Sequence, residues 1–162
     1  MNLYLLRHGD ALPAVGDDAT RPLSPLGEEQ ASLVGNIMQR LGISIDVLLC
    51  SPLERAQQTA RKIQEILPIK KFILTEHLTP SSNHRNIFNE LQSVCAENIL
   101  CVGHEPHLST MISLLVSGSR GANITVAKAS LAYLEVARPI SQGNGVLKWL
   151  VTPETIQALS YR

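Results

Sequence analysis

Two kinds of hydrophobic pattern alternate along the chain. Short apolar runs bounded by Gly, Pro or polar residues are typical of buried strands, and apolar residues recurring every three or four positions are typical of helices. The apolar runs predict strands at residues 2–7, 46–50, 72–74 and 99–102. The periodic segments predict helices at residues 24–42, 51–68 and 83–95, and a further helix that begins at Pro106. Such an alternation indicates an α/β protein.

The pattern changes near the C-terminus. Residues 130–137 and 146–151 are predicted as strands, and the Gly- and Asn-containing segment 142–145 between them is typical of a hairpin loop. Strands that alternate with helices build a mostly parallel sheet between two layers of helices. We therefore predict a three-layer α/β/α sandwich whose C-terminal hairpin adds an antiparallel edge. No repeat, low-complexity segment or linker divides the chain, so residues 1–162 are expected to form a single domain.

Two of the predicted helices begin with local capping signals. Ser24 is a good N-cap residue, and Pro25 after it suits the first turn of a helix. The segment Ser51-Pro52-Leu53-Glu54 matches a capping box, in which Ser51 caps the helix and Glu54 reaches back to it. The second helix is therefore expected to start directly after the strand at residues 46–50.

Composition narrows the function classes. The 162 residues include 14 basic and 14 acidic side chains, and the resulting zero net charge argues against a nucleic-acid backbone binder or a polybasic membrane module. No apolar run approaches the roughly 18 residues that a membrane span needs. No signal-peptide pattern precedes the first strand, so a cytoplasmic location is expected. The three cysteines lack metal-ligand spacing and are interpreted as small buried hydrophobes in a reducing compartment: Cys50, Cys95 and Cys101.

Three polar motifs stand where predicted strands end. They are Arg7-His8-Gly9, Ser51-Pro52-Leu53-Glu54-Arg55 and Gly103-His104-Glu105-Pro106. Taken singly, each has an ordinary explanation, because an isolated His is usually structural and an Arg in a first helical turn usually pairs with a carboxylate. The carboxyl ends of parallel strands meet at one edge of a sheet, however, so we expect the two histidines and two arginines to gather there.

Together these groups favour a phosphate site. Guanidinium groups and helix N-termini bind phosphoryl oxygens, so no metal or cofactor is required. An imidazole that stays neutral at pH 7 can act as a nucleophile and carry the phosphoryl group covalently. A module that only recognises phosphate remains an alternative, although binding alone needs no nucleophile.

The same motifs carry a family resemblance that extends over essentially the whole chain. The chain resembles the histidine phosphatase superfamily, which is phosphoglycerate mutase-like, through Arg7-His8-Gly9, Ser51-Pro52-x-x-Arg55-Ala56-x-Gln58-Thr59-Ala60 and Gly103-His104-Glu105-Pro106. Within it the chain is most similar to the SixA-type phosphohistidine phosphatases, on the evidence of its short length and of Asp10-Ala11, Arg21-Pro22-Leu23-Ser24 and Leu78-Thr79-Pro80.

The resemblance implies a role for each residue of the site. His8 would be the phosphorylated nucleophile, and Arg7, Arg55 and His104 would complete the phosphate pocket. Arg21, in the loop before the first predicted helix, would be the additional basic residue that SixA-type members bring to the site. The implied enzyme hydrolyses phosphohistidine on a phosphoprotein of the histidine-phosphotransfer type.

One departure concerns the general acid. Larger members of the superfamily carry a carboxylate acid in an insertion after the third strand, and here that segment is short. Glu76 occupies it, but its offset does not match the usual SixA-type Glu, so we interpret it as structural. Asp10, Asp17 and Asp18 are interpreted as loop-capping residues.

The missing acid bears on the substrate. An alkyl phosphate expels a poor leaving group and needs a proton donor, whereas a phosphoramidate such as phosphohistidine needs little help. This favours phosphohistidine, with a small-molecule phosphomonoesterase of the same superfamily as the alternative.

Overall fold

One six-stranded sheet organises the molecule. The structure, a computed structural model, describes residues 1–160, and its strand order is β3-β2-β4-β1-β5-β6. The strands are β1 (Asn2–Arg7), β2 (Ile45–Cys50), β3 (Ile69–Leu74), β4 (Asn98–Gly103), β5 (Leu131–Val136) and β6 (Gly145–Val151). Strands β1 to β4 run parallel, while β5 pairs antiparallel with β1 and β6 pairs antiparallel with β5. The mostly parallel sheet with an antiparallel hairpin at one edge is confirmed.

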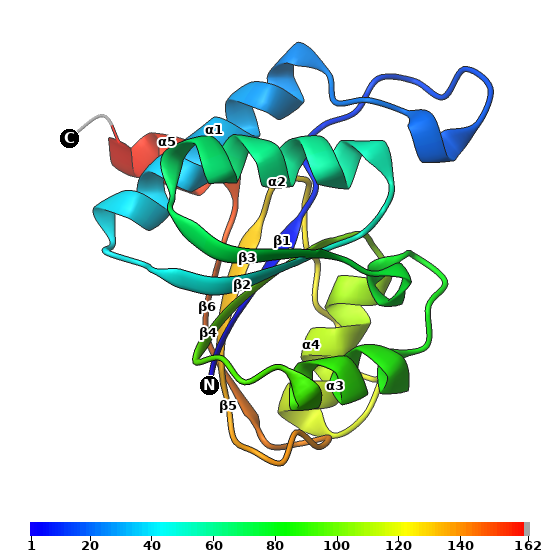
Figure 1. Ribbon diagram of the computed structural model, residues 1–162, viewed down its shortest axis with the longest axis vertical. Helices are drawn as coiled ribbons and strands as arrows, with labels where there is room; N and C mark the ends of the chain where they lie inside the picture. Colours follow the sequence, from blue (N-terminus) through cyan, green and yellow to red (C-terminus); the bar gives the residue numbers. More distant parts are fainter. Residues whose placement is uncertain (161–162) are drawn as a thin grey trace.

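Helices cover both faces of the sheet (Figure 1). One face carries α1 (Pro25–Arg40), α2 (Glu54–Ile66) and α5 (Pro153–Ser160), and the other carries α3 (His84–Ser93) and α4 (His107–Ser117). Two short 3-10 helices, η1 (Asp18–Thr20) and η2 (Glu76–Leu78), lie in the loops after β1 and β3. Within residues 1–160, none of the helices has both the length and the apolar character needed to cross a membrane.

The alternation of side chains along the strands produces two hydrophobic cores. On β1, Leu3 and Leu5 face α3 and α4, while Tyr4 and Leu6 face α1 and α2. Leu3, Leu5 and Leu6 are fully buried. Complete burial of one such side chain stabilises the fold by about 1.5–3 kcal/mol. Both cores hold the same strands, so they fix the sheet edge at which the polar motifs stand.

The start of α2 differs from the predicted capping box. The helix begins at Glu54 with Leu53 at the N-cap position and no side-chain capping bond. Ser51 is fully buried, and its Oγ lies 2.8 Å from Nε2 of His104. The capping-box prediction was wrong because a tertiary partner engages the hydroxyl that the local pattern assigned to the helix end.

Three smaller differences follow from context that the sequence pattern does not carry. Strand β3 starts at Ile69, earlier than predicted, because it pairs with β2 from Ile45 onward. The C-terminal helix α5 was not predicted, and it packs through the buried Ile156. Cys95 is exposed instead of buried, since it follows the end of α3, whereas Cys50 and Cys101 lie in strands and are buried.

Candidate active site

The strand register brings His8 and His104 together. Arg7 of β1 is the register partner of Gly103 of β4, so each histidine is the first residue beyond a paired position. The His8 backbone N–H donates to the Gly103 carbonyl at 3.0 Å. The two imidazole centroids lie 4.9 Å apart with the rings tilted by 52°, and both side chains are buried.

Hydrogen bonds determine the tautomer of His8. Arg55 Nε lies 3.2 Å from His8 Nε2, and an arginine nitrogen can only donate. His8 Nε2 must therefore be unprotonated, and Nδ1 carries the proton that it donates to the Gly9 carbonyl at 2.7 Å. The ring presents a lone pair on Nε2, which is the form that can attack an electrophile.

The surroundings keep both imidazoles neutral. The pKa of His8 is lowered to about 4, mainly by burial and also by Arg55, Arg7 and Arg21, while the bond to the Gly9 carbonyl opposes the shift. Burial, together with His8 and the two nearest arginines, lowers the pKa of His104 to about 2. At neutral pH the site therefore holds neutral imidazoles beside positively charged guanidiniums.

Each of the three guanidinium nitrogens of Arg55 donates a hydrogen bond within the site. Besides Nε on His8, its Nη1 donates to the Asp18 carbonyl at 2.8 Å, and its Nη2 pairs with the Asp18 carboxylate at 3.0 Å. Arg21 pairs with the other oxygen of the same carboxylate, through Nε at 2.8 Å. Asp18, in an exposed loop, therefore holds the two arginines together. A dianion in the place of its carboxylate would accept from the same guanidinium N–H groups.

Asp18 thus differs from the loop-capping role that the sequence suggested. The N-cap of η1 is Asp17, whose carboxylate accepts from the Ala19 N–H at 3.0 Å, as predicted. Burial raises the pKa of Asp18, but Arg55 and Arg21 outweigh it and lower the pKa overall. Asp10 accepts from the Ser24 hydroxyl at 2.6 Å and pairs with Lys128, which ties the loop after β1 to the start of α1.

Arg7 and His104 are two further predicted site residues, and each lies near enough to His8 for the two groups to affect each other's charge. Arg7 Nη1 donates to the Val126 carbonyl at 2.8 Å, while its Nε is buried and has no hydrogen-bond partner within the described residues. His104 contacts Ser51 through Nε2, and its Nδ1 is likewise buried without a partner in the part of the chain that the structure describes. Both side chains therefore hold unused polar atoms near His8.

Two supporting residues fix the loop around His8. The Gly9 N–H donates to Oγ1 of Thr59, and this hydroxyl donates in turn to the Arg55 carbonyl at 2.7 Å. A Cβ on Gly27 would collide with the Asp10 carbonyl oxygen, so the loop and α1 can approach this closely only with glycine there. The sequence offered no signal for the packing role of Gly27, because nothing in its neighbourhood predicts that approach.

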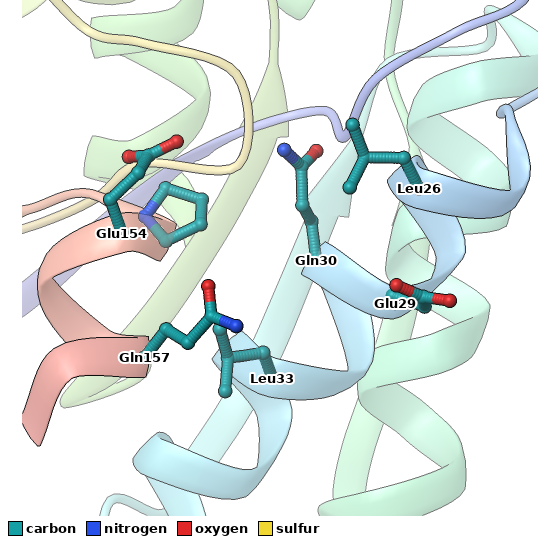
Figure 2. Close-up of a pocket in the computed structure, with 7 residues that line it drawn as sticks. Leu26, Glu29, Gln30, Leu33, Glu154 and Gln157 are labelled. Atoms are coloured by element: carbon teal, nitrogen blue, oxygen red, sulfur yellow. The ribbon is translucent and has the colours of Figure 1, made fainter. Parts of the chain in front are cut away.

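Other features lie apart from these residues. Glu76 is exposed at the start of η2 and makes no side-chain bond to His8, His104 or the arginines. Within residues 1–160, no cluster of three or more His, Cys, Asp or Glu side chains could hold a metal ion. A hollow of about 330 Å³ between α1 and α5 is lined by residues such as Gln30 and Gln157 (Figure 2), and none of its lining residues belongs to the pocket around His8.

Comparison with known proteins points to one family. The sequence model of the histidine phosphatase superfamily (branch 1) matches residues 3–79 of this chain. Phosphohistidine phosphatase SixA of Escherichia coli (strain K12) is 27% identical over 158 residues, which are 94% of this chain and 94% of that protein. A phosphohistidine phosphatase SixA homolog of Haemophilus influenzae is 30% identical over 145 residues, 83% of this chain and 87% of its own length.

The fold has a solved counterpart. The structure of the protein histidine phosphatase SixA complexed with tungstate matches with a TM-score of 0.87 and 24% identity, over 94% of this chain and 97% of that chain. At this level of identity, the likeness concerns the arrangement of helices and strands.

Proposed function

Because the chain belongs to the histidine phosphatase superfamily and is a phosphatase of that type, we propose that it hydrolyses phosphohistidine on a protein, with His8 as the nucleophile. The observation that carries the proposal is the unprotonated Nε2 of His8, which accepts from Arg55 within a pocket that also contains His104. The SixA relatives named above are themselves described as phosphohistidine phosphatases.

The chemistry proceeds in two displacements. The lone pair on His8 Nε2 attacks phosphorus, a P–N bond forms to His8, and the P–N bond to the substrate imidazole breaks. Water then attacks the phosphoryl group on His8 and the P–N bond to His8 breaks, which returns the bonding electron pair to Nε2 and releases inorganic phosphate and the proton given up by the water. Arg55, Arg7 and Arg21 bind the phosphoryl oxygens by charge-assisted hydrogen bonds. His104 stabilises the charge that develops on those oxygens in the transition state.

Binding requires Arg55 to exchange partners. In the structure its donors are engaged by Asp18 and by the His8 lone pair. A phosphoryl group has three oxygens that can replace the Asp18 carboxylate, and attack on phosphorus uses the Nε2 lone pair. The Asp18 carboxylate is exposed although Arg55 is buried, so water can solvate the carboxylate when a phosphoryl group takes its place on Arg55.

The leaving group fits the absence of a positioned acid. Once the other ring nitrogen of the substrate carries a proton, the substrate imidazole departs as a neutral molecule. An alkoxide from an alkyl phosphate would need a proton donor, and none of the carboxylates within residues 1–160 bonds to His8 or His104. The substrate class we propose is therefore a phosphoramidate, displayed on a histidine-phosphotransfer domain or a similar phosphoprotein in the cytoplasm.

A substrate panel tests the proposal. A phosphohistidine peptide, a series of sugar and nucleotide phosphates and an aryl phosphate would be compared by kcat/KM. The proposal requires the phosphohistidine peptide to exceed every alkyl phosphate, by about 10²-fold or more, since a general acid contributes about 10²–10⁴ where it is needed. A sugar or nucleotide phosphate with the highest kcat/KM would make the enzyme a small-molecule phosphomonoesterase. If no phosphate can be trapped on His8 and no substrate is turned over, the protein would instead be a module that only recognises phosphate.

A further inference from the structure

A groove that contains two exposed arginines lies over the first turns of α3 and α4. We propose that it binds an acidic segment of the protein substrate, next to the phosphorylated histidine. The inference rests on the proposed function, because the acidic segment would belong to the protein that carries the phosphohistidine. The groove, formed by the segment after η2 and the first turns of α3 and α4, is defined by the residues that line two adjoining hollows.

The two hollows join through shared residues. One of about 320 Å³ is lined by Pro80–His84, Pro106, His107, Thr110 and Arg120. The other, of about 280 Å³, shares Asn83, His84 and Arg120 with the first and continues along Arg85 and Phe88 to Ile140. Pro106 and His107, which line the first hollow, follow His104 by two and three residues, and His107 is near enough to His104 to help lower its pKa. A polypeptide with its phosphorylated residue in the pocket would thus have this groove in its path.

The groove is basic and lacks carboxylates. Its charged residues are Arg85 and Arg120, both exposed, and none of the residues lining the two hollows is Asp or Glu. Neither guanidinium bonds to another side chain or to a carbonyl group within residues 1–160. Glu105 and Glu90, each next in sequence to a lining residue, bond to other groups than these arginines: Glu105 accepts from Ser109, and Glu90 accepts from Thr75 and His77.

This distinguishes the two arginines from most others in the molecule. Arg55 and Arg21 bond to Asp18, Arg61 bonds to Glu54, and Arg138 bonds to four carbonyls in the last turn of α3 and just after it. Guanidinium groups whose N–H donors are unoccupied are suited to carboxylates, which they bind through two parallel hydrogen bonds. The carboxylates of an acidic peptide could bind both guanidinium groups without a metal.

The rest of the groove lining is uncharged and mixes polar residues with the apolar Pro80, Pro106, Phe88, Leu114 and Ile140. His84 and His107 stack with centroids 4.1 Å apart, and burial keeps both neutral. The first N–H of α3 that needs a cap, that of Arg85, already bonds to the Asn83 side chain. Recognition of an anion must therefore come from the two arginine side chains and not from the end of the helix.

Matched peptides test the groove. Two phosphohistidine peptides would be prepared that differ only in flanking residues, which are Glu in one and Gln in the other. The ratio of their kcat/KM values would be measured for the wild type, for the double variant Arg85→Gln/Arg120→Gln and for Arg40→Gln. Arg40 is exposed at the end of α1 and has no ion pair within the described residues, so it is a control for loss of a single positive charge.

The groove predicts a preference for the Glu peptide of about tenfold in the wild type and in Arg40→Gln, and a ratio near one in the double variant. Using a ratio within each enzyme removes any general effect of the substitutions on folding. Equal kcat/KM for both peptides in the wild type would overturn the inference. A preference that survives in the double variant would overturn it as well.

A binding measurement separates this inference from the proposed function. The proposed function fails if an aryl phosphate is hydrolysed and neither phosphohistidine peptide is. In that case the inference about the groove is tested separately, by measuring binding of the unphosphorylated peptides through fluorescence anisotropy. Binding of the Glu peptide that the double variant loses would support the groove, and absence of binding would overturn it. Tighter binding of a single-stranded oligonucleotide than of the Glu peptide would assign the arginines to a phosphate backbone and would also overturn it.

Discussion

The molecule contains two buried pairs of histidines, and only one of them has the features of a catalytic site. His8 and His104 lie 4.9 Å apart with tilted rings, and His84 and His107 lie 4.1 Å apart and nearly parallel. Burial is the largest cause of the lowered pKa in all four. A neutral imidazole is therefore common to both pairs and does not by itself distinguish a nucleophile.

The difference lies in the partners of the ring nitrogens. Arg55 and the Gly9 carbonyl fix both nitrogens of His8, whereas neither nitrogen of His107 has a partner within residues 1–160. A fixed tautomer directs a lone pair at a defined point, and the guanidiniums around it can bind the charge that arrives there. Orientation and neighbouring charge make the site, and burial only keeps the ring neutral.

The largest effect should come from removing the nucleophile. His8→Ala is expected to reduce kcat by about 10³-fold or more, because no other group can carry the phosphoryl intermediate. Its urea midpoint should stay close to that of the wild type, since His8 stands beyond the end of β1. His77→Ala serves as the matched control and should keep kcat within about threefold. Activity of His8→Ala within tenfold of the wild type would remove His8 from this role.

A second prediction concerns stability, where the two pairs should behave alike. The pKa of His107 is about 4 in the folded protein and near 6.5 in the unfolded chain, so the unfolded chain binds the extra proton as the pH falls. Stability should therefore decrease from about pH 6.5 down to about pH 4, by about 3 kcal/mol for this one group. Urea unfolding of His107→Gln at pH 7 and pH 4.5 should show a smaller difference than the wild type.

His8→Gln sharpens that measurement, because the pKa of His8 is also about 4 and the variant should lose a similar part of the pH dependence. The two variants should then be alike in stability profile and unlike in activity. A wild-type pH dependence in His107→Gln would mean that this histidine is protonated in the folded protein, which would contradict the comparison of the two pairs.

The third prediction concerns the charge around His8. Arg55→Ala should weaken inhibition by vanadate by about 10–100-fold, the effect of losing a buried guanidinium that makes charge-assisted hydrogen bonds to the bound anion. Arg61→Ala on the same helix removes an exposed pair with Glu54 and should change the inhibition constant by less than about twofold. Equal effects of the two substitutions would place Arg55 outside the pocket.

A smaller effect of opposite sign is expected at Asp18. Its carboxylate competes with an incoming anion for Arg55 and Arg21. Asp18→Asn should therefore tighten vanadate binding, by up to about fivefold for ion pairs whose carboxylate is exposed. Weaker binding in Asp18→Asn would show that the carboxylate holds the arginines in their binding positions, and the measurement distinguishes the two cases by sign.

Much of the site could be predicted from the sequence because strand ends are marked by hydrophobic pattern. The predicted strands at residues 2–7 and 99–102 became the paired strands β1 and β4, and the two histidines stand just beyond the ends of these strands. The position of Arg55 followed in the same way from the run that ends at Cys50. These predictions needed only the rule that parallel strands end at one edge of the sheet.

The errors occurred where a residue has both a local and a distant partner available. Ser51 matched a helix cap, but His104 lies beside it in the fold, and Asp18 matched a loop cap, but Arg55 reaches it from α2. A local sequence pattern predicts only the partner that is close in sequence and contains no information about the distant one. The same limit explains why α5 was missed, since its short amphipathic segment is stabilised by packing on α1 and by burial of Ile156.

The smallest effect is expected at Glu76. This carboxylate is exposed at the start of η2 and makes no bond to the residues around His8, so Glu76→Gln should change kcat/KM by less than about twofold. Without a positioned acid, rates on aryl phosphates should rise steeply as the pKa of the leaving phenol falls, and alkyl phosphates should be nearly inert. Measuring kcat/KM for a series of aryl phosphates in both enzymes checks the two expectations together. A flat dependence on the leaving group, with a large loss in Glu76→Gln, would identify Glu76 as the proton donor and would make phosphate esters the better substrates.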